Sequence, residues 1–131
     1  MKRRISLKTL EKKIQYWQKV LKLDGWKITA VFKPQHKLDP QDPDTAAQVV
    51  ECWPLEKVAV IEFATNYPKH DGYEISWNID TLILHELIHV LCWEKTTDLP
   101  ENIQDHSKFQ IFEEFLCNTL SKIIYDNIKI M

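Results

Sequence analysis

The chain has 131 residues, of which 44% are apolar and 27% are charged, a composition typical of a folded globular protein. This length predicts one domain spanning residues 1–131, and five Trp, five Phe and four Tyr supply bulky side chains for its core. The two glycines and the modest net charge of −2 exclude a glycine-rich phosphate loop and extensive disorder.

The basic residues are concentrated near the amino-terminal end. Residues 1–22 hold eight Lys or Arg side chains and a single acid, Glu11, so their net charge is +7 against −9 for the remainder. A basic arm on an acidic body is typical of contact with nucleic acid, and equally of a solvated helix face. We therefore treat nucleic acid as a candidate partner through residues 2–22.

Three cysteines (Cys52, Cys92 and Cys117) are an odd number, and the charged start is not followed by the apolar run of a signal peptide. We expect reduced thiols and a cytoplasmic location. The most apolar stretch, residues 81–93, contains two His and one Glu and is too short to cross a bilayer, so we expect no membrane segment.

The first predicted element is an amphipathic helix with Ser6 as its N-cap and a turn at residues 24–25 as its end. Its apolar residues recur every three or four positions: Leu7, Leu10, Ile14, Trp17 and Leu21. Segments rich in β-branched and aromatic residues predict strands at 26–33, 47–53 and 58–64.

A short edge strand is predicted over residues 74–78. A helix follows from residue 81 to about residue 95, with Asp80 as its N-cap; it is apolar on nearly every face and should be buried. A last amphipathic helix is predicted from His106 to about Ile130. A helix, three or four strands and two helices in this order predict one α+β domain.

The predicted buried helix carries an H-E-x-x-H motif made of His85, Glu86 and His89. Residues four apart share a helix face, so the two imidazoles converge on one Zn²⁺ ion. Glu86 can then act as general base on a zinc-bound water without being a ligand itself. Buried polar groups are costly unless compensated, and a metal ion supplies that compensation.

A catalytic zinc site needs a third protein ligand, for which the downstream candidates are His106, Glu113 and Glu114. Lys95 stands where a metzincin has its third His, which excludes that arrangement. A stripe of small or polar residues would let the last helix approach the histidines closely: Glu114, Cys117, Asn118 and Ser121. Glu113 lies nearer the centre of the apolar face and remains an alternative.

Residues 114–121 resemble the E-x-x-A-N-x-F-A segment of the ImmA/IrrE family of zincin-like metallopeptidases, with Cys117 in place of the first Ala and Ser121 in place of the second. They are more distantly similar to the E-x-x-x-D helix of thermolysin-like gluzincins. The resemblance implies a minimal zincin-like fold, Glu114 as the third zinc ligand, and Asn118 as a residue that orients a ligand histidine.

Residues 105–109 also resemble the H-G-x-x-F or H-S-x-x-F segment of SprT-like metallopeptidases, although Phe109 stands one position earlier than in that segment; the resemblance would make His106 the third ligand. The alternative is that Asp105 or Ser107 caps the last helix and His106 is merely exposed. The order of elements is similar, too, to small metallopeptidases encoded by phages or mobile elements, which implies a bacterial or phage cytoplasmic setting.

These observations predict a zinc-dependent metallopeptidase that cleaves a protein or peptide substrate held as an added strand at the sheet edge. Tyr67, His70 and Tyr73 are candidate donors for the oxyanion, although surface or packing roles would explain them equally. The alternative is a non-catalytic zinc-containing binding or regulatory module whose basic first helix contacts DNA or a protein partner.

Overall fold

The computed structural model describes residues 5–38, 45–65, 69–70, 73–74, 78–96 and 106–130. Its helices are α1 (Leu7–Val20), α2 (Ile79–Thr96) and α3 (His106–Ile130), with a short 3₁₀ helix η1 (Gln35–Lys37). Its strands are β1 (Lys27–Lys33), β2 (Ala47–Trp53), β3 (Val58–Ala64), β4 (Lys69–His70) and β5 (Tyr73–Glu74). The α+β class is confirmed, as are the predicted bounds of β2, β3 and α3.

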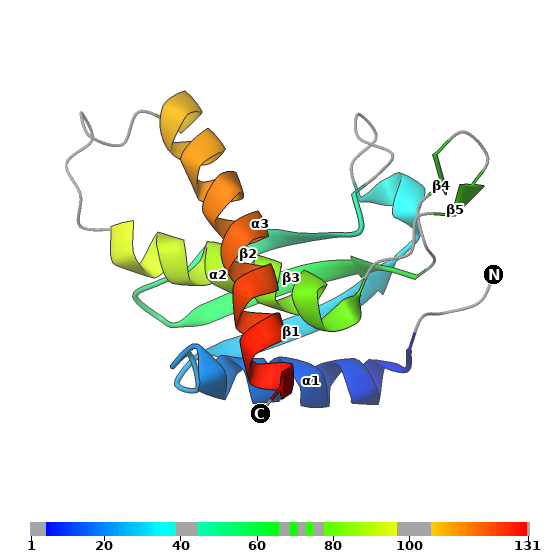
Figure 1. Cartoon of the computed structure of the whole chain (residues 1–131), viewed down its shortest axis with the longest axis horizontal. Helices are drawn as coiled ribbons and strands as arrows, with labels where there is room; N and C mark the ends of the chain where they lie inside the picture. The colour runs from blue at the N-terminus through cyan, green and yellow to red at the C-terminus, as the bar shows by residue number, and fades with distance from the viewer. Residues whose placement is uncertain are drawn as a thin grey trace.

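Strand β3 is the central strand of a three-stranded sheet with the order β1-β3-β2 (Figure 1). It pairs in parallel with β1 and antiparallel with β2. Val49 pairs with Ile61 and Glu51 with Val60, so Val50 is an extra residue that forms a β-bulge in β2. Because of this bulge, residues three apart in β2, Val49 and Cys52, both pack against the core.

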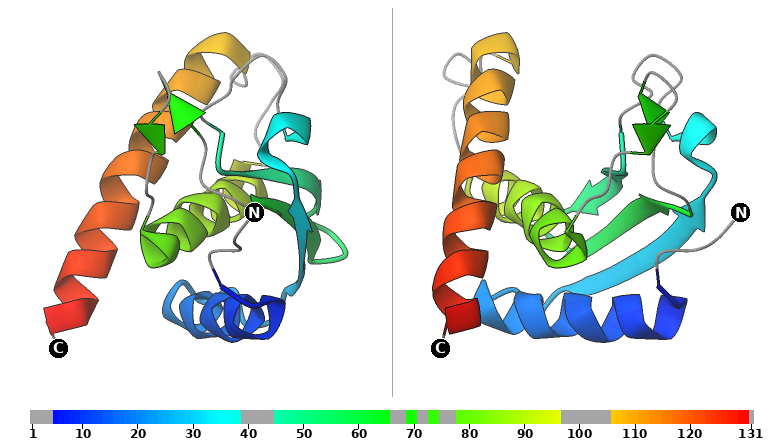
Figure 2. Two further views of the ribbon diagram at one scale, coloured as in Figure 1. Left: turned by 90° about the vertical axis from the view of Figure 1, so that its right-hand side faces the viewer. Right: turned by 45° about the vertical axis from the view of Figure 1, so that its right-hand side comes forward.

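Helices α1 and α2 lie on one face of the sheet, and α3 crosses α2 on the side away from the sheet (Figure 2). Alternate apolar side chains of the strands meet the apolar surface of α2 in the core. The buried residues of this core include Ala30, Ala59, Ile61, Phe63, Ile83, Leu84, Leu87 and Val90. Helix α2 is therefore the buried helix that its all-round apolar sequence predicts.

The two N-caps show one prediction confirmed and one wrong. Ser6 Oγ accepts a hydrogen bond from the backbone N–H of Thr9 at 3.2 Å, as expected for the cap of α1. Helix α2, in contrast, is capped by Asn78, whose Oδ1 accepts from the N–H groups of Asp80 at 2.9 Å and Thr81 at 3.3 Å. Asp80 is therefore inside the first turn and not the cap.

Polar contacts hold α2 near both of its ends. The H-E-x-x-H motif lies between them, in the central turns of the helix. The Asp80 carboxylate accepts a hydrogen bond from Trp17 Nε1 at 2.9 Å and forms an ion pair with Lys13 at 3.2 Å. Toward the other end, Trp26 Nε1 donates to Glu94 Oε2 at 2.6 Å. Helix α1 and the start of the sheet thus set the position of α2 along its axis.

Two other boundaries differ from the sequence prediction. Helix α1 ends at Val20, before the turn at residues 24–25, and Lys22 then adopts a left-handed conformation with φ of 61°. The predicted strand over 74–78 overlaps β5 only at Glu74, β5 pairs with β4 and not with the main sheet, and residues 75–77 lie outside the described residues. The described edge strands of the main sheet are β1 and β2.

Within the described segments, we find no helix with the length and apolar character needed to cross a lipid bilayer.

Candidate metal centre

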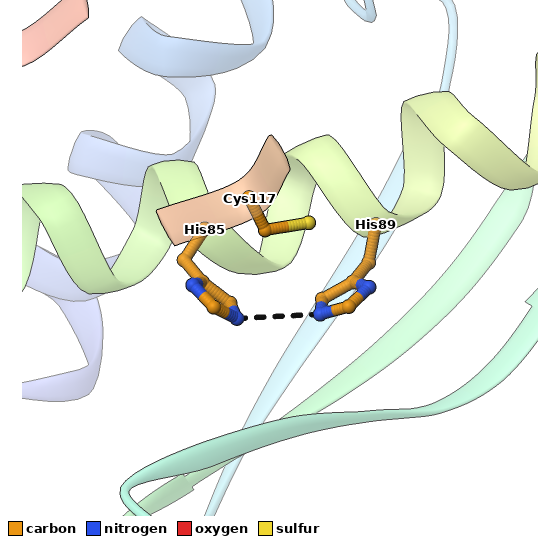
Figure 3. A group of neighbouring side chains, drawn as sticks. All are labelled: His85, His89 and Cys117. Atoms are coloured by element: carbon orange, nitrogen blue, oxygen red, sulfur yellow. Dashed lines mark hydrogen bonds between the residues drawn. The ribbon is translucent and has the colours of Figure 1, made fainter. Parts of the chain in front are cut away.

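His85 and His89 project from the same side of α2, one helical turn apart (Figure 3). Their Nε2 atoms face each other at 3.3 Å, and the ring planes meet edge to face with centroids 5.0 Å apart. Two nitrogens bound at about 2.0–2.1 Å to one tetrahedral zinc ion are about 3.3 Å apart. The two imidazoles therefore have the spacing that a single zinc ion requires.

Glu114 brings a carboxylate from α3 to this pair of nitrogens. Its Oε1 lies 2.7 Å from His89 Nε2 and its Oε2 lies 3.4 Å from His85 Nε2, while 54% of the side chain remains exposed. Hydrogen bonds to His85 and His89 hold the pKa of this carboxyl well below its usual range, against the opposing effect of burial. Glu114 is thus an ionised carboxylate whose oxygens could bind the same ion as the two nitrogens.

Glu113, the neighbouring residue, contacts the other nitrogen of the same ring. His89 Nδ1 donates to Glu113 Oε2 at 2.5 Å, and the Glu113 side chain is buried. A carboxylate on Nδ1 fixes the ring orientation and leaves Nε2 as the metal-binding atom. Burial lowers the pKa of His89, but the hydrogen bonds to Glu113 and Glu114 raise it to about 10.

Glu86 is 4% exposed and lies between α2 and the edge strand β2. Burial raises the pKa of its carboxyl, while His85, His89 and a backbone hydrogen bond from Val49 favour the ionised form. A buried carboxylate whose proton affinity is raised beside two imidazoles is suited to accept and release a proton. The contact with Val49 also links this group directly to the bulged strand.

Cys117, to which no sequence pattern assigned a site role, also lies at this centre. Its sulfur and one ring nitrogen from each of His85 and His89 lie within 4.8 Å of one another (Figure 3). The side chain is fully buried, and a hydrogen bond with Cys92 and burial raise the pKa of its thiol. The available signal was its position one turn after Glu114, since residues three apart share a helix face.

The structure does not place Asn118 or His106, the two other residues named from resemblance, against the histidines. Asn118 is exposed, and the hydrogen bond described for it is made by its backbone carbonyl, which accepts from Ser121 Oγ at 3.2 Å. Glu113 occupies the position beside a histidine that the resemblance implied for Asn118. His106 begins α3, but its side chain lies outside the described residues.

Two imidazoles and a carboxylate form a donor set that suits zinc in sites that keep one position open. The spacing of His85 Nε2, His89 Nε2 and the Glu114 oxygens fits such an ion. Comparison of the chain with protein-family models, with curated proteins and with solved structures gave no match.

Proposed function

We propose that this chain is a zinc-dependent metallopeptidase that hydrolyses peptide bonds of a protein substrate. The proposal rests on the convergence of His85, His89 and Glu114 at one point, with the buried Glu86 beside them. These three donors would hold Zn²⁺, which supplies Lewis-acid activation of water and of the scissile carbonyl when it is bound.

Glu86 is the proton carrier in this proposal. Its carboxylate takes a proton from the attacking water and delivers it to the leaving amine nitrogen. The burial that raises its pKa increases its affinity for the proton in the first step, while the adjacent imidazoles favour the ionised form. Glu113 orients His89 and does not contact the reacting groups.

Strand β2 is the part of the sheet best placed to hold the substrate. It is an edge strand, so one side of its backbone is not paired within the described sheet, and it packs against α2 where the motif lies. An extended peptide that adds to this edge gains backbone hydrogen bonds, which hold a chain with little regard to its sequence. We therefore assign the substrate to the edge formed by β2.

Metal content and peptide cleavage test the proposal together. Purified wild-type protein should bind zinc one to one, and both His85→Ala and Glu114→Ala should lose it. Glu86→Gln should keep zinc but reduce cleavage of an unfolded protein substrate by about 10²–10⁴-fold, as loss of a general base does. The exposed Glu56 offers a matched control, since Glu56→Gln should change neither. Wild-type cleavage rates in Glu86→Gln, or no zinc bound after zinc is added back, would refute the proposal.

A second candidate function is a zinc-containing binding module that contacts nucleic acid. It is favoured by the outer face of α1, where Lys8, Lys12 and Lys19 are exposed and recur at helical spacing. The opposite face of α1 is buried in the core, so these side chains are held in one row. Lys13 is not part of the row, because it pairs with Asp80.

DNA binding at several salt concentrations tests this candidate. The double variant Lys12→Gln/Lys19→Gln should lower the slope of log K against log salt by about two, while Lys13→Gln should leave it nearly unchanged. Equal slopes in wild type and the double variant would show that the row of lysines does not bind DNA phosphates.

A further inference from the structure

The metal centre has a second type of donor that the proposed peptidase does not use. Cys117 follows Glu114 by one helical turn on α3, so the thiol and the carboxylate approach the same two histidines. The sulfur and a ring nitrogen of each histidine all lie within 4.8 Å of one another. Helix α3 thus offers both an oxygen and a sulfur atom to this centre.

Packing alone gives Cys117 an ordinary explanation, because buried cysteines usually act as small apolar side chains. Its complete burial where α3 crosses α2 fits that explanation. Packing does not, however, require the sulfur to lie within 4.8 Å of a ring nitrogen of each of two imidazoles. Cys92 on α2 can be compared with Cys117. It is hydrogen-bonded to Cys117, yet it does not belong to the group of possible metal ligands formed by His85, His89 and Cys117.

We propose that Cys117 is a further metal-binding residue, whose sulfur binds a divalent cation softer than Zn²⁺, such as Cd²⁺, together with His85 and His89. The inference rests on the metal centre of the proposed function. Thiolate sulfur selects soft metal ions, and imidazole nitrogen accepts many of the same ions. When the metal–sulfur bond forms, the thiol proton passes to solvent.

The required rearrangement is small. In a tetrahedral zinc site a bond to sulfur of about 2.3 Å and one to nitrogen of about 2.0–2.1 Å place the two donor atoms about 3.6 Å apart. The donor atoms at Cys117, His85 and His89 all lie within 4.8 Å of one another, so the sulfur and the nitrogens must approach by at most roughly 1 Å. Rotations of the cysteine and imidazole side chains supply a movement of this size.

Sulfur binding changes what the centre can do. If Glu114 stays bound as well, four protein donors surround the ion, and no position is open to water or substrate. Closed sites of this kind are structural and not catalytic. A thiophilic cation held through Cys117 therefore inhibits the hydrolysis proposed above, while the three-donor set of His85, His89 and Glu114 permits it.

Titration of the metal-free, full-length protein with Cd²⁺ tests the inference. Sulfur ligation gives a sulfur-to-cadmium charge-transfer absorption in the ultraviolet, which nitrogen and oxygen ligands do not give. The absorption should rise to one equivalent in wild type, in Cys92→Ser and in Cys52→Ser. It should be absent in Cys117→Ser and in Cys117→Ala, and the affinity for Cd²⁺ should fall more than about tenfold, since even loss of a group that only orients a ligand costs that much.

Two substitutions at position 117 guard against a folding defect, because Ala keeps the small volume and Ser keeps the polar atom; circular dichroism verifies the fold of each. Retention of the absorption in the folded Cys117 variants, or Cd²⁺ binding in wild type without the absorption, would overturn the inference and leave the proposed zinc site standing. Failure of wild type to bind Cd²⁺ and Zn²⁺ at all would overturn both. In Glu114→Gln the absorption should persist while zinc-dependent cleavage is lost.

Discussion

Glu113 on α3 accepts a hydrogen bond from Nδ1 of His89 on α2, 24 positions earlier in the chain, at 2.5 Å. The adjacent Glu114 reaches Nε2 of the same ring from the opposite side at 2.7 Å. Neighbouring residues on a helix point about 100° apart, so two consecutive carboxylates can hold one imidazole between them. One of them then serves as the donor to the ion, and the other orients the ring.

Loss of Glu113 should weaken zinc binding without abolishing it. In Glu113→Ala, His89 Nδ1 loses its acceptor, and groups that orient a ligand histidine typically contribute about 10–100-fold to metal affinity. Competition with a chromophoric chelator measures this change. Glu113→Gln, which keeps an oxygen acceptor but not its charge, should fall between wild type and Glu113→Ala. Unchanged affinity in Glu113→Ala would show that the contact does not support the site.

Asp80 should contribute to stability mainly through Trp17 and only slightly through Lys13. Asp80→Ala leaves the buried indole N–H of Trp17 without its described acceptor, which should lower the free energy of unfolding by about 1–3 kcal/mol. Lys13→Met removes an ion pair whose lysine is about one-third exposed, worth less than about 1 kcal/mol. Urea unfolding of the two variants measures both, and equal losses would contradict this ranking.

Acid should remove the contribution of Glu62 to stability. Burial on β3 raises the pKa of this carboxyl, but the Lys33 Nζ at 2.7 Å and the Gln48 amide at 3.0 Å outweigh it and lower the pKa below its ordinary value of 4.5. The folded state is therefore favoured above pH 4.5, and this contribution disappears as the pH falls through the folded pKa. The stability difference between wild type and Glu62→Gln should shrink on acidification. If it grows, the sign of the shift is wrong.

The core side of α2 should be far more sensitive to truncation than the turn between β2 and β3. Leu87, which stands between the two histidines in the sequence, is fully buried in the core, and Leu87→Ala should cost about 2–5 kcal/mol of unfolding free energy. Leu55 in the turn is 88% exposed, and Leu55→Ala should change stability by less than about 0.5 kcal/mol. Thermal or urea unfolding compares the two, and similar losses would contradict the position of the core.

Elements defined by local patterns were predictable from the sequence. Strands β2 and β3 alternate or run apolar between clear turns, α3 keeps a helical period throughout, and Ser6 is a favoured cap residue. The juxtaposition of His85 and His89 also follows from spacing alone, because both lie on one helix. Each of these inferences depends on residues only a few positions apart.

Features that depend on contacts between distant segments were not predictable in the same way. The parallel pairing of β1 with β3 skips β2, and no local pattern encodes it. Asn78 and Asp80 are both favoured cap residues, and the choice is decided by Trp17 and Lys13, which hold Asp80 in another role. Likewise, the crossing of α3 over α2 determines which of Glu113, Glu114 and Cys117 reaches which atom.

The bulge at Val50 takes up one extra residue in β2 without changing which side chains face the core. Val49 and Cys52 pack against the core although they are three apart, and deletion of Val50 would place them two apart, the regular spacing of side chains on one face of a strand. The exposed Val50 side chain can also be replaced with little effect on packing. This strand should therefore accept substitution or deletion at position 50, whereas deletion of a residue in its regular part would turn the side chains beyond it to the opposite face.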